Sequence, residues 1–244
     1  MVISSLENQR VKSLVKLQQK KYRDLENAYL VEGEHLVEEA IKASVVLEII
    51  LLEGEQEIND FPCTFVTNDV MKKITSLEST TKVVAICKKQ EFSSITGNKI
   101  LLLDEVQDPG NLGTIIRSSV AFGIEMILLS ENTVDLYNPK VLRSAQGMHF
   151  HIPVLSVNSI EALTYLKEKG YTIFGTNVVN GVDARELDHS SLNKFCLVMG
   201  NEGKGIRQSV CELCDKNLYI PMSEKVESLN VGVACSILLY ELGR

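Results

Sequence analysis

Three segments of this 244-residue sequence place polar and glycine residues directly after apolar runs long enough to be strands. The first segment, residues 104–117, turns at Pro109-Gly110 and contains Asn111 and Arg117. We expect Asn111 to cap a helix there, because Pro-Gly favours a turn and Asn is a preferred capping residue. A helix start with free N–H groups and a guanidinium in reach is suited to a phosphate. The alternative is an ordinary surface arginine after a proline turn.

The second segment, residues 199–205, holds three glycines within six positions, with Glu202 among them. Glycines let the backbone approach a ligand closely, and a carboxylate in such a loop could take a proton or hold a cation. A P-loop would need Ser or Thr after Lys204, where Gly205 stands. A dinucleotide fingerprint would need a third glycine where Gln208 stands. We therefore expect a ligand-facing loop of another kind, with a flexible turn as the alternative.

The third segment begins at residues 220–222 and continues through Ser228, Asn230 and Gly232. Ser228 is a good candidate for the cap of a C-terminal helix. A glycine inside a helix costs about 1 kcal/mol relative to alanine. Gly232 therefore predicts close packing of that helix against another element.

Apolar runs alternate with amphipathic stretches along the chain, which predicts an α/β fold with a mostly parallel sheet. Strands are expected at 29–31, 47–52, 64–66, 83–87, 99–103, 125–129, 151–154, 171–175, 195–199 and 217–220. Helices are expected at 8–22, 33–43, 69–76, 112–122, 139–144, 159–169, 205–211 and 229–242. In such a sheet, ligands bind beyond the carboxyl ends of strands, where the three segments lie.

The polar stretch 88–98 separates two α/β series and serves as the candidate linker. It predicts a small N-terminal domain at residues 1–92 and a larger domain at 98–244. Both series are long enough to bury a core.

Charge is distributed unevenly over a chain whose formal net charge is -7. That net charge argues against a protein that coats nucleic acid with its whole surface. Residues 1–24 hold six basic side chains against two acidic ones, a net charge of +4. The basic residues are Arg10, Lys12, Lys16, Lys20, Lys21 and Arg23. They predict a local cationic surface for a phosphate-bearing partner.

The six cysteines and the N-terminal sequence indicate a cytoplasmic protein. No basic stretch followed by an apolar core begins the sequence, and the longest apolar runs are strand-sized, so we expect neither a secretory signal nor a membrane span. Cys211-x-x-Cys214 has no second pair at a spacing that a zinc site needs. We therefore expect structural thiols and no metal.

The three segments together closely resemble the three motifs of the SpoU-type (TrmH family) RNA ribose 2′-O-methyltransferases of the SPOUT superfamily. The matching motifs are Asn111-x-Gly113-x-x-x-Arg117, residues 199–203, and residues 220–222 with 228–231. They occur in the family's order over most of residues 100–244. Residues 1–90 also resemble the family's small α/β RNA-binding extension, on the basic first helix and the step at residues 30–33.

The resemblance implies a trefoil-knotted parallel-sheet domain that binds S-adenosylmethionine and works as a homodimer, with the active site near the subunit interface. It implies backbone contacts to the cofactor from Gly200, Ile220 and Leu229, with Met199, Met222 and Asn230 nearby. It implies a methyl-transfer site formed by Asn111, Arg117, Glu202, Ser228 and Asn230. The basic residues of the first 24 would contact the RNA.

The reaction that the resemblance implies is methyl transfer to a ribose 2′-hydroxyl of structured RNA, with rRNA favoured over tRNA. Arg117 would engage the RNA phosphate and hydroxyl, held by Asn111 and Glu202, or would take the hydroxyl's proton. The second role is demanding, because the pKa of a guanidinium ordinarily lies above 12. The alternative function is a non-catalytic RNA-binding or ribosome-assembly factor that keeps the fold.

Overall fold

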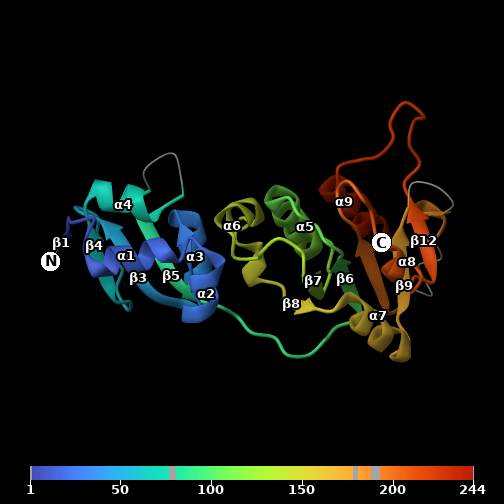
Figure 1. The fold of residues 1–244 in the computed structure, drawn as a ribbon, viewed down its shortest axis with the longest axis horizontal. Helices are drawn as coiled ribbons and strands as arrows, with labels where there is room; N and C mark the ends of the chain where they lie inside the picture. The colour runs from blue at the N-terminus through green and yellow to red at the C-terminus, as the bar shows by residue number, and fades with distance from the viewer. Residues whose placement is uncertain (1, 77–80, 178–180, 188–192, 244) are drawn as a thin grey trace. The chain divides into compact units, whose positions relative to one another are not determined.

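The computed structural model describes residues 2–76, 81–177, 181–187 and 193–243 (Figure 1). The chain forms two compact units. Unit 1 comprises Met1–Glu91 and Asp135–Phe150, and unit 2 comprises Phe92–Val134 and His151–Arg244. The boundary between Glu91 and Phe92 lies within the polar stretch 88–98.

Unit 1 is built on a mixed five-stranded sheet of order β1-β4-β3-β5-β2. The strands are β1 Val2–Ile3, β2 Ala28–Glu32, β3 Val46–Leu52, β4 Cys63–Val66 and β5 Val83–Lys88. The helices are α1 Gln9–Lys16, α2 Lys20–Glu26, α3 Glu34–Lys42, α4 Asn68–Ile74 and, from later in the chain, α6 Pro139–Ala145 with the short η1 Met148–Phe150. β5 runs antiparallel to both of its neighbours, and the remaining pairs are parallel.

The single helix predicted over 8–22 is wrong, because α1 ends at Lys16 and α2 begins at Lys20. The side chain of Arg23 lies in the break between them. Its guanidinium donates to the carbonyls of Leu17 at 2.9 Å and Gln18 at 2.7 Å. These carbonyls therefore find their donor in a side chain, where a continuous helix would have used backbone N–H groups.

The segment Asp135–Phe150 packs within unit 1, although the predicted domain 98–244 includes it. Leu142 and Phe150 join the buried cluster that also contains Tyr29 and Val37. Arg23 forms an ion pair of 2.5 Å with Asp135, where the segment begins. Such long-range packing has no local sequence signal, so composition along the chain could not assign this segment.

Unit 2 is built on a seven-stranded sheet of order β10-β12-β9-β11-β6-β7-β8, in which every pair is parallel. The strands are β6 Lys99–Leu103, β7 Met126–Ser130, β8 Val154–Val157, β9 Thr172–Thr176, β10 Val182–Asp183, β11 Phe195–Met199 and β12 Lys216–Tyr219. The helices are α5 Pro109–Ala121, α7 Ser159–Glu168, η2 Ala184–Glu186, α8 Gln208–Cys211 and α9 Val231–Leu242.

The predicted α/β class and parallel sheet are confirmed, and β6 and β11 have the predicted bounds. The strand expected at 151–154 begins only at Val154, since Pro153 before it has no N–H to donate to a ladder. β1 and β10 span two residues each, too short to leave a pattern. The trefoil knot stays a prediction. Among the described residues, no helix combines the length and apolar character that a membrane crossing requires.

Candidate active site

The three motif segments leave the sheet of unit 2 at the same edge. They follow β6, β11 and β12, and the carboxyl ends of parallel strands lie together. β6 and β11 are direct neighbours, so residues 104–111 and the loop 200–206 start side by side.

Asn111 joins the three motifs through its side chain. Its Nδ2 donates to Oε1 of Glu202 at 3.0 Å, and its Oδ1 accepts from Nδ2 of Asn230 at 2.8 Å. Asn111 is not the helix cap that we expected. The cap is Asp108, whose side chain accepts from the N–H of Asn111 at 2.9 Å. The amide of Asn111 is thereby free to bridge the second and third motifs.

Glu202 lies against the start of α5. Its carboxylate accepts from the N–H of Asp108 at 2.9 Å and from the N–H of Gln107 at 3.1 Å, besides the amide of Asn111. Partial burial raises the pKa of Glu202, but these hydrogen bonds outweigh it and lower that pKa below the ordinary value. A carboxylate held as an anion is a poor proton acceptor. Glu202 therefore anchors the loop to a helix N-terminus, where negative charge is favoured.

The third motif contributes the cap of α9. The cap is Asn230, whose Oδ1 accepts from the N–H of Gly232 at 3.0 Å and of Val233 at 3.3 Å. The prediction that Ser228 caps this helix is therefore wrong. Gly232 faces α5, since a Cβ there would lie 3.4 Å from Cγ2 of Thr114, an ordinary van der Waals contact, and 3.2 Å from Oδ1 of Asn230. α5 and α9 thus meet at the residue that lacks a side chain.

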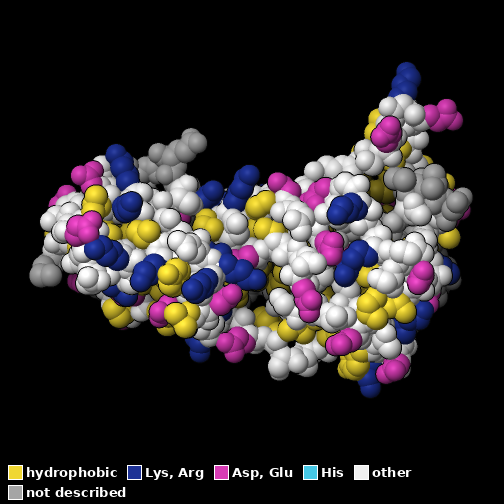
Figure 2. All heavy atoms as spheres, in the orientation of Figure 1, with side chains coloured by type: hydrophobic (Ala, Val, Ile, Leu, Met, Phe, Trp, Pro, Cys, Tyr) yellow, Lys and Arg dark blue, Asp and Glu magenta, His cyan; other side chains and the backbone are white. Residues whose placement is uncertain are grey.

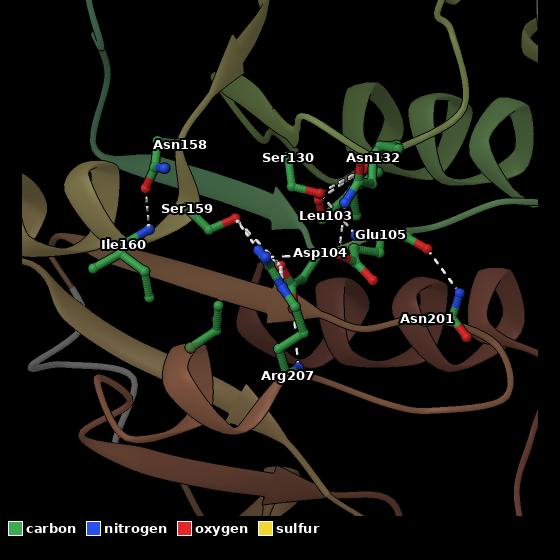
Figure 3. Close-up of polar contacts among 12 residues, drawn as sticks. Leu103, Asp104, Glu105, Ser130, Asn132, Asn158, Ser159, Ile160, Asn201 and Arg207 are labelled. Atoms are coloured by element: carbon green, nitrogen blue, oxygen red, sulfur yellow. Dashed lines mark hydrogen bonds and ion pairs between the residues drawn. The ribbon is translucent and has the colours of Figure 1, made fainter.

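Asp104 and Arg207 form an ion pair that the sequence did not reveal (Figure 3). Asp104 is fully buried and accepts from Arg207 Nη2 at 2.5 Å, from Nε at 3.0 Å and from the backbone N–H at 3.0 Å. Ser159 donates to the same carboxylate at 3.2 Å. By sequence alone, Asp104 could as easily be a solvated loop acid. Only its burial, which requires Arg207 103 residues later, identifies it as structural.

The two residues after β6, Asp104 and Glu105, hold the loop 200–206 in place. The N–H of Asp104 donates to the carbonyl of Met199 at 2.8 Å where the loop starts, and Asp104 binds Arg207 where it ends. Between these points, Nδ2 of Asn201 donates to the carbonyl of Glu105 at 2.9 Å (Figure 3). The loop is therefore a fixed element and not a flexible turn.

Gly200 is required by the fold of this loop. Asn201 and Gly205 pair with each other through two backbone hydrogen bonds of 3.0 Å. A Cβ on Gly200 would lie 2.2 Å from the carbonyl carbon of Gly205. Gly205 itself has a φ of +70°, which favours glycine. The fold of the loop thus accounts for both glycines, and the close ligand approach that we predicted for them stays a prediction.

A cavity of about 380 Å³ lies at this edge of the sheet. Its wall includes five of the six predicted cofactor residues: Met199, Gly200, Ile220, Met222 and Leu229. Glu202 and Ser228 also line it, whereas Asn230 does not. Its volume is typical of a small-molecule site. Leu218, Val231 and Leu238 add apolar wall, and polar backbone groups follow the ends of β9, β11 and β12. These features fit S-adenosylmethionine, whose adenine and methionine chain are apolar with polar edges.

Arg117 lies on the exposed face of α5. Within the residues that the structure describes, it makes no hydrogen bond or ion pair, so Asn111 and Glu202 do not hold it as we expected. Asn111 is engaged with Glu202 and Asn230 instead. The guanidinium of Arg117 is therefore available to a group from outside this chain.

The predicted RNA-binding residues lie in unit 1. Lys12, Lys16, Lys20 and Lys21 are exposed, and Figure 2 shows Lys and Arg side chains on the face that carries α1 and α2. Arg23 is not part of this surface, because its side chain is only 4% exposed. Arg10 pairs with Glu48, and Lys12 pairs with Glu7 at 2.6 Å. The exposed cationic surface is thus smaller than the six residues suggested.

The cysteines show no sign of a metal site within the described residues, which hold no cluster of three or more His, Cys, Asp or Glu suited to a metal ion. Burial raises the pKa of Cys214 to about 12, so this group stays a thiol at neutral pH. Its Sγ donates to the carbonyl of Val210 at 3.5 Å.

Comparison with known proteins decides the family. Residues 98–240 match the SpoU rRNA Methylase family. The chain belongs to that family. Residues 8–85 match the MRM3-like substrate binding domain, which agrees with the resemblance of the N-terminal region. The SpoU match covers all three motif segments and the loop that lines the cavity.

Several relatives resemble this SpoU protein over nearly its whole length. The 23S rRNA (guanosine(2553)-2′-O)-methyltransferase RlmP of Bacillus subtilis is 42% identical, over 98% of each chain. Among solved structures, the AdoMet-bound rRNA methyltransferase from Sinorhizobium meliloti shares 28% sequence identity with this chain. The match covers 99% of this chain and 97% of the other, with a TM-score of 0.88. AviRb of Streptomyces viridochromogenes, at 23% identity, 97% coverage of both chains and a TM-score of 0.86, shares the fold.

The activity follows from this membership. This SpoU protein is an RNA 2′-O-methyltransferase that uses S-adenosylmethionine. Its substrate is rRNA, as the sequence predicted.

Proposed function

We propose that this protein methylates the ribose 2′-hydroxyl of one guanosine in 23S rRNA, the nucleotide named for its Bacillus subtilis relative. The observation that carries the proposal is the link from Glu202 through Asn111 to Asn230, which joins all three motifs beside the cavity. A binding-only descendant of the fold has no need of such an assembly. The similarity over 98% of both chains extends to the N-terminal domain that would select the RNA.

In the proposed mechanism, S-adenosylmethionine, when bound, would supply an electrophilic methyl group on its sulfonium sulfur. The chain's own residues must hold the ribose 2′-hydroxyl at near-attack distance from the methyl group. They must also allow this hydroxyl to lose its proton. We assign Arg117 to the RNA phosphate and the 2′-hydroxyl, because it is exposed and uncommitted within the described chain. A role as proton acceptor would need a neutral guanidinium, so we favour the orienting role, in which the hydroxyl proton passes to solvent water as the oxygen binds the methyl group.

Three residues are positioning residues, which hold the elements around the site: Asn111, Glu202 and Asn230. Glu202 fixes the loop 200–206 against α5, and Asn230 fixes the start of α9 against the same helix. Ser228 lines the cavity and is placed to contact the substrate ribose or the cofactor. Met199, Gly200, Ile220, Met222 and Leu229 hold the cofactor, largely through backbone groups and apolar contact, with Asn230 fixing the helix beside them.

We further propose that the protein is a homodimer that works in the cytoplasm, where ribosomes are assembled. α9 leaves Val233 and Tyr240 about half exposed, at 48% and 49%, although its other face packs on α5. A second copy over α5 and α9 would cover these side chains and place a partner's surface next to Arg117. Sedimentation of the purified protein measures this assembly.

Mapping of 2′-O-methyl groups in 23S rRNA from cells with and without the gene tests the function. We expect one guanosine mark to disappear with the gene and to return with the wild-type protein but not with Arg117→Ala. An unchanged methylation map would support the alternative of a non-catalytic binding factor. Loss of a mark in tRNA would overturn the rRNA assignment.

A further inference from the structure

A second cavity, of about 380 Å³, lies in unit 1 between α1, α2 and residues of β2, β3 and β5. Its floor includes Leu14, Leu17, Ala28 and Ile86, which belong to the buried core. Nothing in the methyl-transfer reaction uses this cavity. Its size is nonetheless that of a site for one small, mostly apolar group.

The rim of this cavity is apolar where a surface is normally polar. Leu25 is 73% exposed and Leu47 is 49% exposed. The ring of Tyr22 lines the cavity next to Lys16, whose Nζ lies 5.3 Å from the ring centroid. The Nζ of Lys21 lies 5.9 Å from the same centroid. The ring of Tyr22 thus lies near two ammonium groups at the mouth of a mostly apolar cavity.

The cavity lining carries two basic residues, Arg10 and Lys16, and two acidic ones, Glu26 and Glu48, so the excess of positive charge comes from the neighbouring Lys20 and Lys21. Glu48 pairs with Arg10, and its other oxygen accepts from Thr64 Oγ1 at 2.7 Å. Glu26 is an exposed carboxylate without an ion pair among the described residues. A carboxylate at the edge of such a site can accept from the amino group of a base. Lys12 and Lys20 add charge on the adjoining surface of α1 and α2.

We propose that this cavity binds one unstacked nucleobase of the RNA substrate, with the flanking phosphates on Lys16 and Lys21. Single-stranded RNA is recognised by this combination of an aromatic ring for the base and cations for the backbone. A duplex would offer phosphates alone and would leave the cavity and Tyr22 unused. The proposal rests on the proposed function only for the identity of the polymer as RNA.

The test compares two RNA probes on the full-length protein by fluorescence anisotropy. One is an octamer of cytidylate, and the other has the same eight phosphates but abasic riboses at its central positions. We expect the base-bearing probe to bind about 5- to 100-fold more tightly, as one stacked base provides. Tyr22→Ala should remove this preference, and Tyr22→Phe should keep it because the ring remains.

A second variant tests the cavity independently, in case Tyr22→Ala does not fold. Leu25→Glu adds a negative charge at the rim on a side chain that is already exposed, and should weaken both probes. Leu6→Glu, on a side chain of unit 1 that is 44% exposed and outside the cavity, is the matched control and should change neither.

Equal binding of the two probes by the wild-type protein would overturn the proposal, as would equal loss in Tyr22→Ala and Tyr22→Phe. A change of sedimentation in Leu25→Glu but not in Leu6→Glu would mean that the cavity receives another protein chain, which also overturns it. The rRNA methylation map is measured in parallel. If the mark depends on the gene while the probes bind equally, the nucleobase site fails and the proposed function stands.

Discussion

Asn230 donates a hydrogen bond of 2.8 Å to Asn111, a residue 119 positions earlier in the chain. The bond joins the cap of α9 to the first turn of α5, and the opposite side of the Asn111 amide holds Glu202. The side-chain amide of Asn111 therefore connects three segments that lie far apart in the sequence.

Replacement of this amide should slow the reaction without emptying the cofactor cavity. In Asn111→Ala, two hydrogen bonds are removed, each worth about 0.5–1.5 kcal/mol. We expect kcat to fall by roughly 5- to 150-fold, with a smaller change in cofactor affinity measured by calorimetry. Asn132→Ala, which removes an exposed amide from the neighbouring loop, is the control and should leave kcat unchanged. Equal losses in both variants would contradict the bridging role.

The ion pair of Asp104 and Arg207 should carry much of the stability of unit 2. Arg207→Ala leaves a fully buried carboxylate without its cation, which typically costs about 3–5 kcal/mol. We expect roughly 2–3 kcal/mol in urea unfolding, because the side chain of Arg207 is itself 41% exposed.

A double-mutant cycle separates the pair from its surroundings. Asp104→Asn combined with Arg207→Ala should be more stable than the sum of the single losses predicts, since no unpaired charge remains. The double variant should still bind the cofactor less tightly than the wild type, because the loop 200–206 is no longer held at its end. Strict additivity would show that the two side chains act independently.

Glu202 gives the stability of the protein a defined pH dependence. Its folded pKa lies below the ordinary value of 4.5, because hydrogen bonds favour the anion over the opposing effect of burial. The stabilisation is therefore fully present above pH 4.5 and is lost as the pH falls through the lowered folded pKa. We expect Glu202→Gln to be less stable than the wild type at pH 7, and the difference to shrink below pH 4.5 in urea unfolding. A difference that is constant with pH would contradict this assignment.

Arg117 should matter for catalysis and hardly at all for folding. Since it makes no hydrogen bond or ion pair within the described chain, Arg117→Ala should change the free energy of unfolding by no more than about 0.5 kcal/mol. Methyl transfer to rRNA should nearly cease, with cofactor affinity retained. Arg117→Lys distinguishes the roles. A full rate in that variant would show that the planar guanidinium is not needed.

The exposed lysines of α1 and α2 should set the salt dependence of RNA binding. Neutralisation of Lys12, Lys16 and Lys20 to Gln should weaken RNA binding and reduce the slope of log K against log salt by about 0.7–0.9 for each RNA phosphate that the protein no longer neutralises. Cofactor affinity, measured on the same triple variant, should not change. Unchanged RNA affinity would place the RNA on another surface.

Much of the fold and most of the cofactor cavity could be predicted, because their signals are local. An apolar run of five residues, such as β6 or β11, predicts a strand from its own sequence. In a parallel sheet, the residues that follow the strands lie at one common edge. The residues that line the cavity were therefore found from three short segments. Their resemblance to the SpoU-type motifs, and not their spacing alone, implied both the cofactor and the reaction.

The helix caps and the charged contacts were decided by tertiary structure. Asp108 and Asn230 cap α5 and α9 where we had expected Asn111 and Ser228, because several nearby polar residues can cap and only packing selects one.

The same holds for two ionisable residues, Arg23 and Asp104. From its sequence context, Arg23 would be a surface cation, but in the structure it contacts Asp135 and the carbonyls at the α1–α2 break. Asp104 would be a loop acid, but in the structure it is buried against Arg207. The residue types alone determined which chemistry was available. Burial depends on partners a hundred residues away, so only the folded chain decided which charges face the solvent and which hold the site.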